Sequence, residues 1–385
     1  MLTLPPLGLY IHFPWCVKKC PYCDFNSHAK LNNIPAQDYV NALIDDFTSY
    51  LDDFQGRQIK SIFMGGGTPS LFPTEALVRL FEFLDDTGLV VPNSEITLEA
   101  NPGTIEHGCF HDYKNMGINR ISLGVQSFQN DKLQNLGRIH SCQDVYHAVE
   151  ALKQAGFDNF NIDLMHGLPQ QNLEDALFDL HAGINFNPTH ISWYQLTIEP
   201  NTAFAVKPPQ LPDENTLESI ECNGKKLLEK NGYKPYEVSA FSKNQQYQGQ
   251  HNLNYWQFGD YIGIGAGAHS KITDIKKQQI RRHWKRKNPK LYLAERTFPF
   301  GRKTITCEGL PHEFMLNALR LVDGFSVELF ESTTGLSINV IKPALTTAIR
   351  QKLLIKNNDQ YRCTELGRLF LNDVTNLFMS ESNIF

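Results

Sequence analysis

The first 200 residues alternate short β-rich runs with longer amphipathic stretches. This alternation predicts a parallel sheet whose strands are joined by right-handed crossover helices. The six predicted strands cover residues 9–13, 59–64, 95–99, 119–124, 159–164 and 190–196.

Between these strands, apolar residues recur at spacings of three and four, which predicts helices with one buried stripe each. The first helix has Asp38 placed to cap it. A second lies between Ser141 and Gly156, and a third follows Asn172. The apolar residues that define the three stripes are Val40, Leu43, Ile44, Phe47, Leu51 and Phe54; Val145, Ala148, Val149 and Leu152; and Leu173, Ala176, Leu177, Leu180 and Ile184.

The second half of the chain predicts a different unit. After a proline-rich segment we expect a helix over 217–230 and a strand over 236–238. A later helix ends at Gly324, and two more helical patterns, around 353–355 and 361–363, are separated by Asn357 and Asn358. We predict a barrel over 1–240, a connecting segment over 241–308 and a smaller, mostly helical domain over 309–385. This last domain is expected to contain a small hairpin, and a winged helix is its candidate fold.

Composition narrows the class of protein. The 385 residues carry a formal charge of −5, which gives no overall field for binding nucleic acid or anionic membrane. The N-terminus has no charged region ahead of an apolar segment, and no run of about 18 apolar residues follows, so we expect a cytoplasmic protein. Five of the eight cysteines are scattered and are expected to be buried: Cys109, Cys142, Cys222, Cys307 and Cys363.

The other three cysteines, Cys16, Cys20 and Cys23, lie together in the loop after the first strand. A structural zinc site needs four ligands, and only His12 or His28 could supply the fourth. A four-iron cubane needs only the three thiolates and keeps one iron open to an amino acid's amino and carboxylate groups. The spacing alone leaves both metals possible.

Polar residues gather at the ends of the predicted strands, where the loops of a parallel β/α barrel converge on one mouth. Gly65 to Gly67 could let a ligand approach the backbone, or they could form an ordinary turn. Glu99 and Asp163 could bind a ribose hydroxyl or a cation, or pair with an arginine for structure. The strand-end residues are Gly65, Gly66, Gly67, Thr68, Glu99, Gln126, Asp163, Tyr194 and Gln195, and the candidate arginines are Arg120 and Arg138.

The CxxxCxxC loop after a first strand, with Tyr22 before its last cysteine, resembles the radical SAM superfamily. The segments GGGTPS, EANPGT, ISLGVQSF and NIDLMHGLPQQ extend this resemblance to the subgroup related to oxygen-independent coproporphyrinogen III oxidase. The resemblance implies a partial (β/α)6 barrel and a [4Fe-4S] cluster held by Cys16, Cys20 and Cys23. It also implies S-adenosylmethionine bound by Tyr10, Gly66, Gly67, Thr68, Glu99, Gln126, Arg138 and Asp163.

Two departures separate the chain from the oxidases of this subgroup. The oxidases carry a fourth cysteine at the position of Phe25, and they have an extension ahead of the cluster strand. The sequence instead resembles the sister group of HemW-type heme chaperones, in its phenylalanine form of the loop and in the motif HNxxYW at residues 251–256. This resemblance implies a protein that binds heme and transfers it to acceptor proteins rather than an enzyme. Candidate acceptors include membrane-associated respiratory enzymes, and the alternative function is the oxidase itself.

Within that motif, His251 is the candidate axial ligand of heme iron, and the alternative is a histidine packed in a turn. Tyr255 and Trp256 could supply flat apolar surface for the porphyrin. Eight lysines and arginines with no acid among them lie between residues 275 and 290. Such a run is typical of a solvated face, although heme propionates, anionic membrane or an acidic partner are other possible contacts. We expect no nucleic-acid partner.

Overall fold

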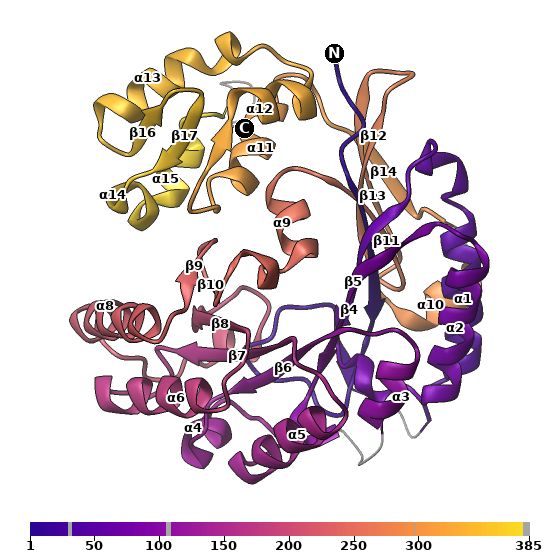
Figure 1. Ribbon diagram of the computed structural model, residues 1–385, viewed down its shortest axis with the longest axis vertical. Coiled ribbons are helices and arrows are strands. Elements are labelled where there is room, and N and C mark those ends of the chain that lie inside the picture. Colours follow the sequence, from indigo (N-terminus) through magenta and orange to yellow (C-terminus); the bar gives the residue numbers. More distant parts are fainter. Residues whose placement is uncertain (30–32, 105–108, 297, 380–385) are drawn as a thin grey trace.

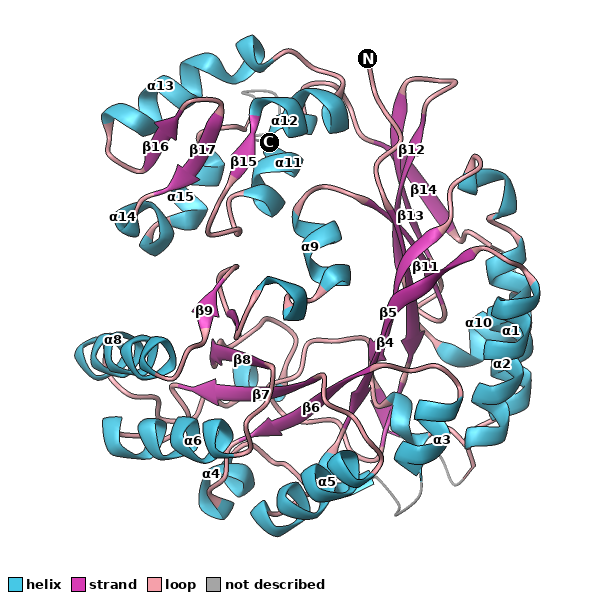
Figure 2. Cartoon of the chain, viewed as in Figure 1, coloured by secondary structure: helices cyan, strands magenta, loops and turns pink. Residues whose placement is uncertain are grey.

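The computed structural model describes residues 1–29, 33–104, 109–296 and 298–379. A large curved sheet carries helices along its outer side, and a second group of helices with a small sheet lies beyond α9 (Figures 1 and 2). Within these residues no helix is long and apolar enough to cross a membrane.

The large sheet has the order β14-β13-β12-β11-β1-β4-β5-β6-β7-β8-β10-β9. All six predicted strands are confirmed as β1, β4, β5, β6, β7 and β8, which run parallel. The strands of this sheet are β1 (Leu7–Phe13), β4 (Ile59–Gly66), β5 (Val90–Ala100), β6 (Arg120–Gln126), β7 (Phe160–His166), β8 (His190–Gln195), β9 (Lys234–Pro235), β10 (Ala240–Ser242), β11 (Asp260–Ile264), β12 (His269–Asp274), β13 (Gln279–Trp284) and β14 (Gly301–Thr304).

Helices connect the parallel strands as predicted. Ser141 and Asn172 each cap the helix that follows, in a reciprocal pairing with the aspartate three residues on. The helices in this part are α1 (Ala36–Thr48), α2 (Thr74–Asp86), α3 (Cys109–Asn115), α4 (Asn130–Asn135), α5 (Cys142–Gln154), α6 (Leu173–Asn185), α7 (Ala203–Val206), α8 (Glu214–Lys230), α9 (Gln250–Trp256) and α10 (Pro289–Glu295).

Four local predictions were wrong. The helix expected to end at Gly324 already ends at Ala318. Asp38 does not cap α1, because the helix already begins at Ala36 and Asp38 lies in its first turn. The stripe that continued to Phe54 is split, since α1 ends at Thr48 and a separate 3-10 turn covers Leu51–Phe54. No strand covers 236–238: β9 and β10 lie on either side of it, and Glu237 pairs only with Leu321 in an isolated bridge.

The residues of the predicted connecting segment, 241–308, continue the barrel's sheet through β11, which pairs in parallel with β1, and through the antiparallel strands β12 to β14. The basic run spans β13 and the turns on either side of it, and it is not a solvated face at its centre. Lys285 is buried and pairs with Asp46, and Arg282 bonds Glu313 at 2.6 Å. The three domain boundaries themselves stay predictions.

The C-terminal part has its own apolar core, with Phe314, Phe330 and Leu345 at its centre. The helical patterns predicted around 353–355 and 361–363 were wrong. Both runs form strands. Burial alternates along β17, where Tyr361 and Cys363 are buried and Arg362 between them is exposed, whereas β16 buries only Leu354. The elements are α11 (Leu310–Ala318), β15 (Phe325–Ser326), α12 (Val327–Thr334), α13 (Lys342–Arg350), β16 (Leu354–Asn357), β17 (Gln360–Cys363), α14 (Glu365–Leu369) and α15 (Leu371–Asn376).

The prediction that the scattered cysteines are buried is confirmed only in part. Cys363 is buried, Cys142 is half-buried, and Cys222 and Cys307 are exposed. The side chain of Cys109 lies outside what the structure describes. Cysteine spacing carries no information on burial when the residue sits on a helix or loop whose orientation is set by distant packing.

Candidate functional site

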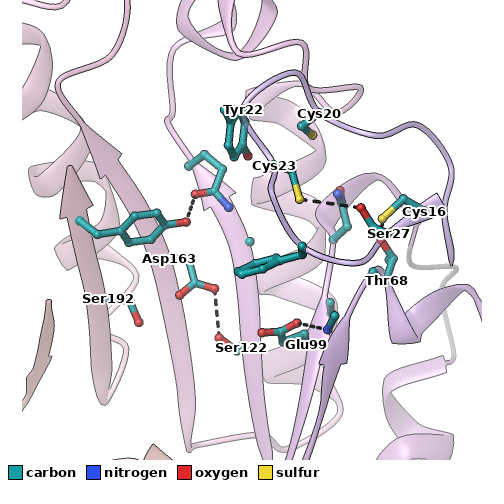
Figure 3. Close-up of a pocket in the computed structure, with 18 of the residues that line it drawn as sticks. Cys16, Cys20, Tyr22, Cys23, Ser27, Thr68, Glu99, Ser122, Asp163 and Ser192 are labelled. Atoms are coloured by element: carbon teal, nitrogen blue, oxygen red, sulfur yellow. Dashed lines mark hydrogen bonds between the residues drawn. The ribbon is translucent and has the colours of Figure 1, made fainter. Parts of the chain in front are cut away.

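A cavity of about 540 Å³ opens at the carboxyl ends of the parallel strands. Its size is typical of a site for a small molecule or cofactor. Three cysteine sulfurs lie along one side, and the carboxylates of Glu99 and Asp163 lie opposite them (Figure 3). The predicted site residues that line it are Cys16, Cys20, Cys23, Gly66, Gly67, Thr68, Glu99, Gln126, Arg138 and Asp163.

The loop that carries the cysteines is held at both of its ends. It starts as β2 (Trp15–Cys16), which pairs with β3 (His28–Ala29). Near its end, the Asn26 side-chain amide donates to the backbone oxygens of Ala266 and Lys287, at 2.8 and 2.9 Å. The His12 ring lies 2.8 Å from the Asn26 carbonyl through Nε2. The loop is therefore fixed to β1 and to the turn after β11.

Each cysteine sulfur has a polar neighbour. Thr68 Oγ1 donates to Cys16 Sγ at 3.5 Å, Arg138 Nη1 donates to Cys20 Sγ at 3.7 Å, and Ser27 Oγ lies 3.8 Å from Cys23 Sγ. Burial raises the pKa of the Cys16 and Cys23 thiols. Thr68 and Arg138, which were predicted to bind S-adenosylmethionine, therefore also contact the cysteine loop.

The donor set fits an iron–sulfur cluster. Among the described residues, no three histidine, cysteine or acidic side chains converge on one point, as a single zinc ion would require. In a cubane each thiolate binds a different iron, so the sulfurs need not converge. None of the three cysteines forms a disulfide, and all three face the cavity.

The glycines at the end of β4 are required by packing as well as by the cavity. A Cβ on Gly66 would lie 2.3 Å from the His12 ring, and one on Gly67 would lie 2.5 Å from the Trp15 carbonyl oxygen. Gly66 also has a φ of +105°. Their backbone also lines the cavity, so packing accounts for these glycines while their position leaves the backbone accessible to a ligand.

The two carboxylates do not pair with an arginine. Glu99 accepts the Gly66 N–H at 3.1 Å, and Asp163 accepts from Ser122 Oγ at 3.0 Å and Asn161 Nδ2 at 2.8 Å. Burial, together with the charge of Asp163, raises the pKa of Glu99 to about 7, and burial also raises the pKa of Asp163. Acids without a cationic partner can accept a cation or the hydroxyl groups of a ligand.

The nearest candidate arginines are engaged elsewhere. Arg120 lies 4.0 Å from Glu95, and Arg138 Nη2 donates to the Gly124 carbonyl at 2.8 Å. No ion pair joins Glu99 or Asp163 to either arginine among the described residues, although the charge of Arg120 opposes the rise in the pKa of Asp163.

Gln126 sits at an irregularity of the sheet. Its φ is +70°, and the pairing of β6 with β7 shifts between Gly124 and Gln126. Tyr194 OH donates to Gln126 Oε1 at 2.7 Å. A non-glycine residue in this conformation costs of order 1 kcal/mol or more and is often found at a functional site.

Two predicted site residues do not line the cavity. Tyr10 OH is within 2.9 Å of His12 Nδ1, and its ring packs on Phe63. His251, on α9, is 8% exposed, and its Nδ1 lies 3.2 Å from Ser61 Oγ. Burial lowers the pKa of His251 to about 4, so its ring is neutral near pH 7.

Several lining residues were not predicted. Ser122 and Ser192 lie two positions before Gly124 and Tyr194, so strand alternation could have placed them on the inner face. Asn252 was not predicted either, and with Trp256, which the HNxxYW motif indicated as a surface for the porphyrin, it brings α9 to the same cavity. Tyr255 packs on Tyr261 and does not line the cavity. Arg320 comes from the turn after α11, and no sequence pattern indicates it.

Fold and site together define a radical SAM protein. Residues 10–181 match the model of the radical SAM superfamily, and residues 305–370 match that of the HemN C-terminal domain. The fold resembles that of coproporphyrinogen III oxidase (HemN) from Escherichia coli, with a TM-score of 0.82 and 22% identity over 98% of this chain and 91% of that one.

Full-length relatives define the family more closely. The protein named heme chaperone HemW of Haemophilus influenzae is 49% identical over 99% of this chain and 100% of its own. The protein of that name from Escherichia coli is 48% identical over the same shares. That of Bacillus subtilis is 32% identical over 97% of this chain and 99% of its own. The chain belongs to the HemW family of radical SAM proteins.

Proposed function

We propose that this protein is a heme chaperone, which binds heme and transfers it to acceptor proteins while it carries a [4Fe-4S] cluster with S-adenosylmethionine. The observation that carries the proposal is one cavity lined both by the three cysteines and by Asn252 and Trp256 of the HNxxYW motif. Full-length relatives that bear the name heme chaperone support it.

For the cofactor, we propose that Cys16, Cys20 and Cys23 each bind one iron. When bound, such a cluster offers its fourth iron to the amino and carboxylate groups of S-adenosylmethionine. Glu99 and Asp163 would hold the hydroxyl groups or the positive charge of that ligand. Its other proposed contacts are Gln126, Arg138, Thr68 and the backbone of Gly66 and Gly67, and Tyr10 supports the site from behind.

Replacement of the cysteines tests the cofactor assignment. The variants Cys16→Ala, Cys20→Ala and Cys23→Ala, reconstituted without oxygen, should lose most of their iron and sulfide. Cys222→Ala is the matched control, because Cys222 is exposed on α8 and far from the loop. Unchanged cluster content in the three variants would contradict the assignment.

For heme, we propose His251 as an axial ligand. Its ring is neutral near pH 7, as iron binding requires, and no hydrogen bond to its Nε2 occurs among the described residues. Because the ring does not line the cavity, α9, which has only seven residues, would have to shift for His251 to reach the iron.

Titration of His251→Ala with heme, followed by absorbance, tests this step. We expect weaker binding and a changed Soret spectrum. His181→Ala, which replaces an exposed histidine on α6, is the control. An affinity and a spectrum equal to those of the wild-type protein would remove His251 from the site.

The oxidase alternative is not favoured. Phe25, at the position of the oxidases' fourth cysteine, is 61% exposed and lines the cavity. The likeness to the Escherichia coli oxidase, at 22% identity, concerns the fold alone. Anaerobic incubation with coproporphyrinogen III and a reductant tests this choice, and conversion to protoporphyrinogen would refute the chaperone proposal.

The acceptors and the compartment belong to the proposal as well. We propose a cytoplasmic protein whose acceptors include membrane-associated respiratory enzymes. Transfer of heme from the loaded protein to an isolated heme-free acceptor, followed by absorbance, would identify them.

A further inference from the structure

Arg320 lines the cavity and forms no direct ion pair with an acid among the described residues. It follows α11 in the C-terminal part of the chain and is half-buried. Its guanidinium carbon lies 4.5 Å from the centre of the Trp256 ring. Among the described residues, no carboxylate oxygen lies within 4.0 Å of its nitrogens. An aromatic face is thus the main contact of this cation.

The backbone holds Arg320 in this position. Val322 N–H donates to the Tyr236 carbonyl at 3.0 Å, and Leu321 forms an antiparallel bridge with Glu237. The Arg320 N–H donates to the Asn317 carbonyl at 3.1 Å. These bonds join the turn after α11 to the edge of the barrel, so the guanidinium is presented to the cavity by a fixed main chain.

Two donors on this wall of the cavity lack acceptors. Arg320 Nε and Trp256 Nε1 are both buried, and neither has a hydrogen-bond partner in the part of the chain that the structure describes. Buried donors are nearly always paired in folded proteins, and an unpaired one costs about 1–3 kcal/mol. Two such donors from separate elements, beside the same cavity, indicate a missing acceptor.

Glu237 is the nearest acid to consider. It lies on the same wall and is 5% exposed, and its Oε1 accepts the Ser239 N–H at 3.0 Å. Burial raises the pKa of Glu237 and the charge of Arg320 opposes that shift, but no hydrogen bond or ion pair joins the two side chains among the described residues. By contrast, the arginines of β13 have acidic partners: Arg281 bonds Asp53 and Arg282 bonds Glu313, each at 2.6 Å. Arg320 has no such direct contact with an acid among the described residues.

We propose that Arg320 and Trp256 form a seat for a carboxylate of the bound porphyrin. This inference rests on the proposed heme function, because heme carries two propionates. A guanidinium matches a carboxylate with two parallel hydrogen bonds, and the indole N–H adds a third donor. A carboxylate here would satisfy both buried donors.

The test compares heme with its dimethyl ester, which keeps the ring and the iron but lacks both carboxylates. Each is titrated by absorbance into the full-length, cluster-loaded protein without oxygen. The wild-type protein should bind the diacid about 10- to 100-fold more tightly than the ester, which is the range expected for hydrogen bonds to a charged group. Arg320→Met, which keeps the aliphatic contact with Trp256, should lose most of this preference.

Arg79→Met is the matched control, since Arg79 is exposed on α2 and its replacement should leave the preference unchanged. Trp256→Phe removes one donor and keeps a ring, and it should reduce the preference less than Arg320→Met. The wild-type comparison and Trp256→Phe remain informative if Arg320→Met unfolds, which thermal unfolding would reveal.

S-adenosylmethionine also carries a carboxylate, so its affinity is measured for the same variants. An unchanged affinity for it, together with the lost diacid preference, supports the porphyrin seat. A weaker affinity for it with the diacid preference intact would overturn the assignment to porphyrin. Equal wild-type affinity for diacid and ester would overturn the seat alone, whereas binding of neither would overturn the heme proposal and this inference together.

Discussion

Arg138 joins the cysteine loop to the end of β6: one guanidinium nitrogen donates to Cys20 Sγ at 3.7 Å, and the other donates to the Gly124 carbonyl at 2.8 Å. The charge of this arginine is thereby fixed beside a proposed cluster ligand. Hydrogen bonds and positive charge near a cluster favour its reduced form, because reduction adds negative charge.

Replacement of Arg138 should therefore lower the cluster's reduction potential. For Arg138→Met we expect a shift of about −50 mV, since a one-electron couple moves about 59 mV for each tenfold change in equilibrium constant. A redox titration followed by electron paramagnetic resonance measures it. The control is Arg79→Met, and a potential equal to the wild-type value would contradict the role of Arg138.

Glu99 should reduce stability at neutral and alkaline pH. Its pKa in the folded protein is about 7 against an ordinary value of 4.5, so the folded state holds its proton more tightly. The contribution of Glu99 to the free energy of unfolding should therefore be most favourable below pH 4.5, and it should fall as the pH rises to 7. Above pH 7 the loss is about 3 kcal/mol.

Glu99→Gln should remove this penalty. Urea unfolding at pH 8 in the absence of S-adenosylmethionine should show the variant to be more stable than the wild-type protein. The difference should shrink as the pH falls from 7 toward 4.5. A variant that is less stable at pH 8 would show that the charged form is favoured by contacts other than the Gly66 N–H.

Gly66→Ala should destabilise the protein through both strain and contact. The residue has a φ of +105°, and the added Cβ would lie 2.3 Å from the His12 ring. The matched control is Gly88→Ala, where φ is +62° but no atom lies within 4 Å. We expect a cost of about 1–2 kcal/mol for the control and a larger one for Gly66→Ala, measured by urea unfolding. Equal costs would mean that the His12 ring moves away freely.

Replacement of Asp46 tests how much its buried ion pair with Lys285, which belongs to the basic run, contributes to stability. Its carboxylate pairs with Lys285 and accepts from Tyr292 OH at 2.9 Å, and both charged side chains are fully buried. Asp46→Asn leaves the lysine charge buried without its partner, which should cost about 3–5 kcal/mol. Asp45→Asn, which breaks the exposed pair with Arg296, should cost less than about 1 kcal/mol. Similar losses of stability in the two variants would contradict the interpretation that burial makes the Asp46–Lys285 pair costly to break.

Much of the barrel could be predicted from local pattern. The six strands follow from the alternation of strand-like and helical runs, and Ser141 and Asn172 mark helix starts because capping involves only neighbouring residues. A small hairpin was expected in the C-terminal domain, but the runs that form β16 and β17 were interpreted as helical because short apolar runs fit both periods. Only the pairing of β17 with β15 and with β16 selects strands over these residues.

By itself the sequence determined the cysteine loop, its position after a first strand and the strand-end polar residues, since contacts between neighbours in the chain and strand periodicity dictate these. Tertiary structure alone decided which polar groups are paired. It placed His251 behind the cavity wall, gave Lys285 a buried partner 239 positions away and brought Arg320 to Trp256. Such contacts depend on the packing of elements far apart in the chain, which no local pattern records.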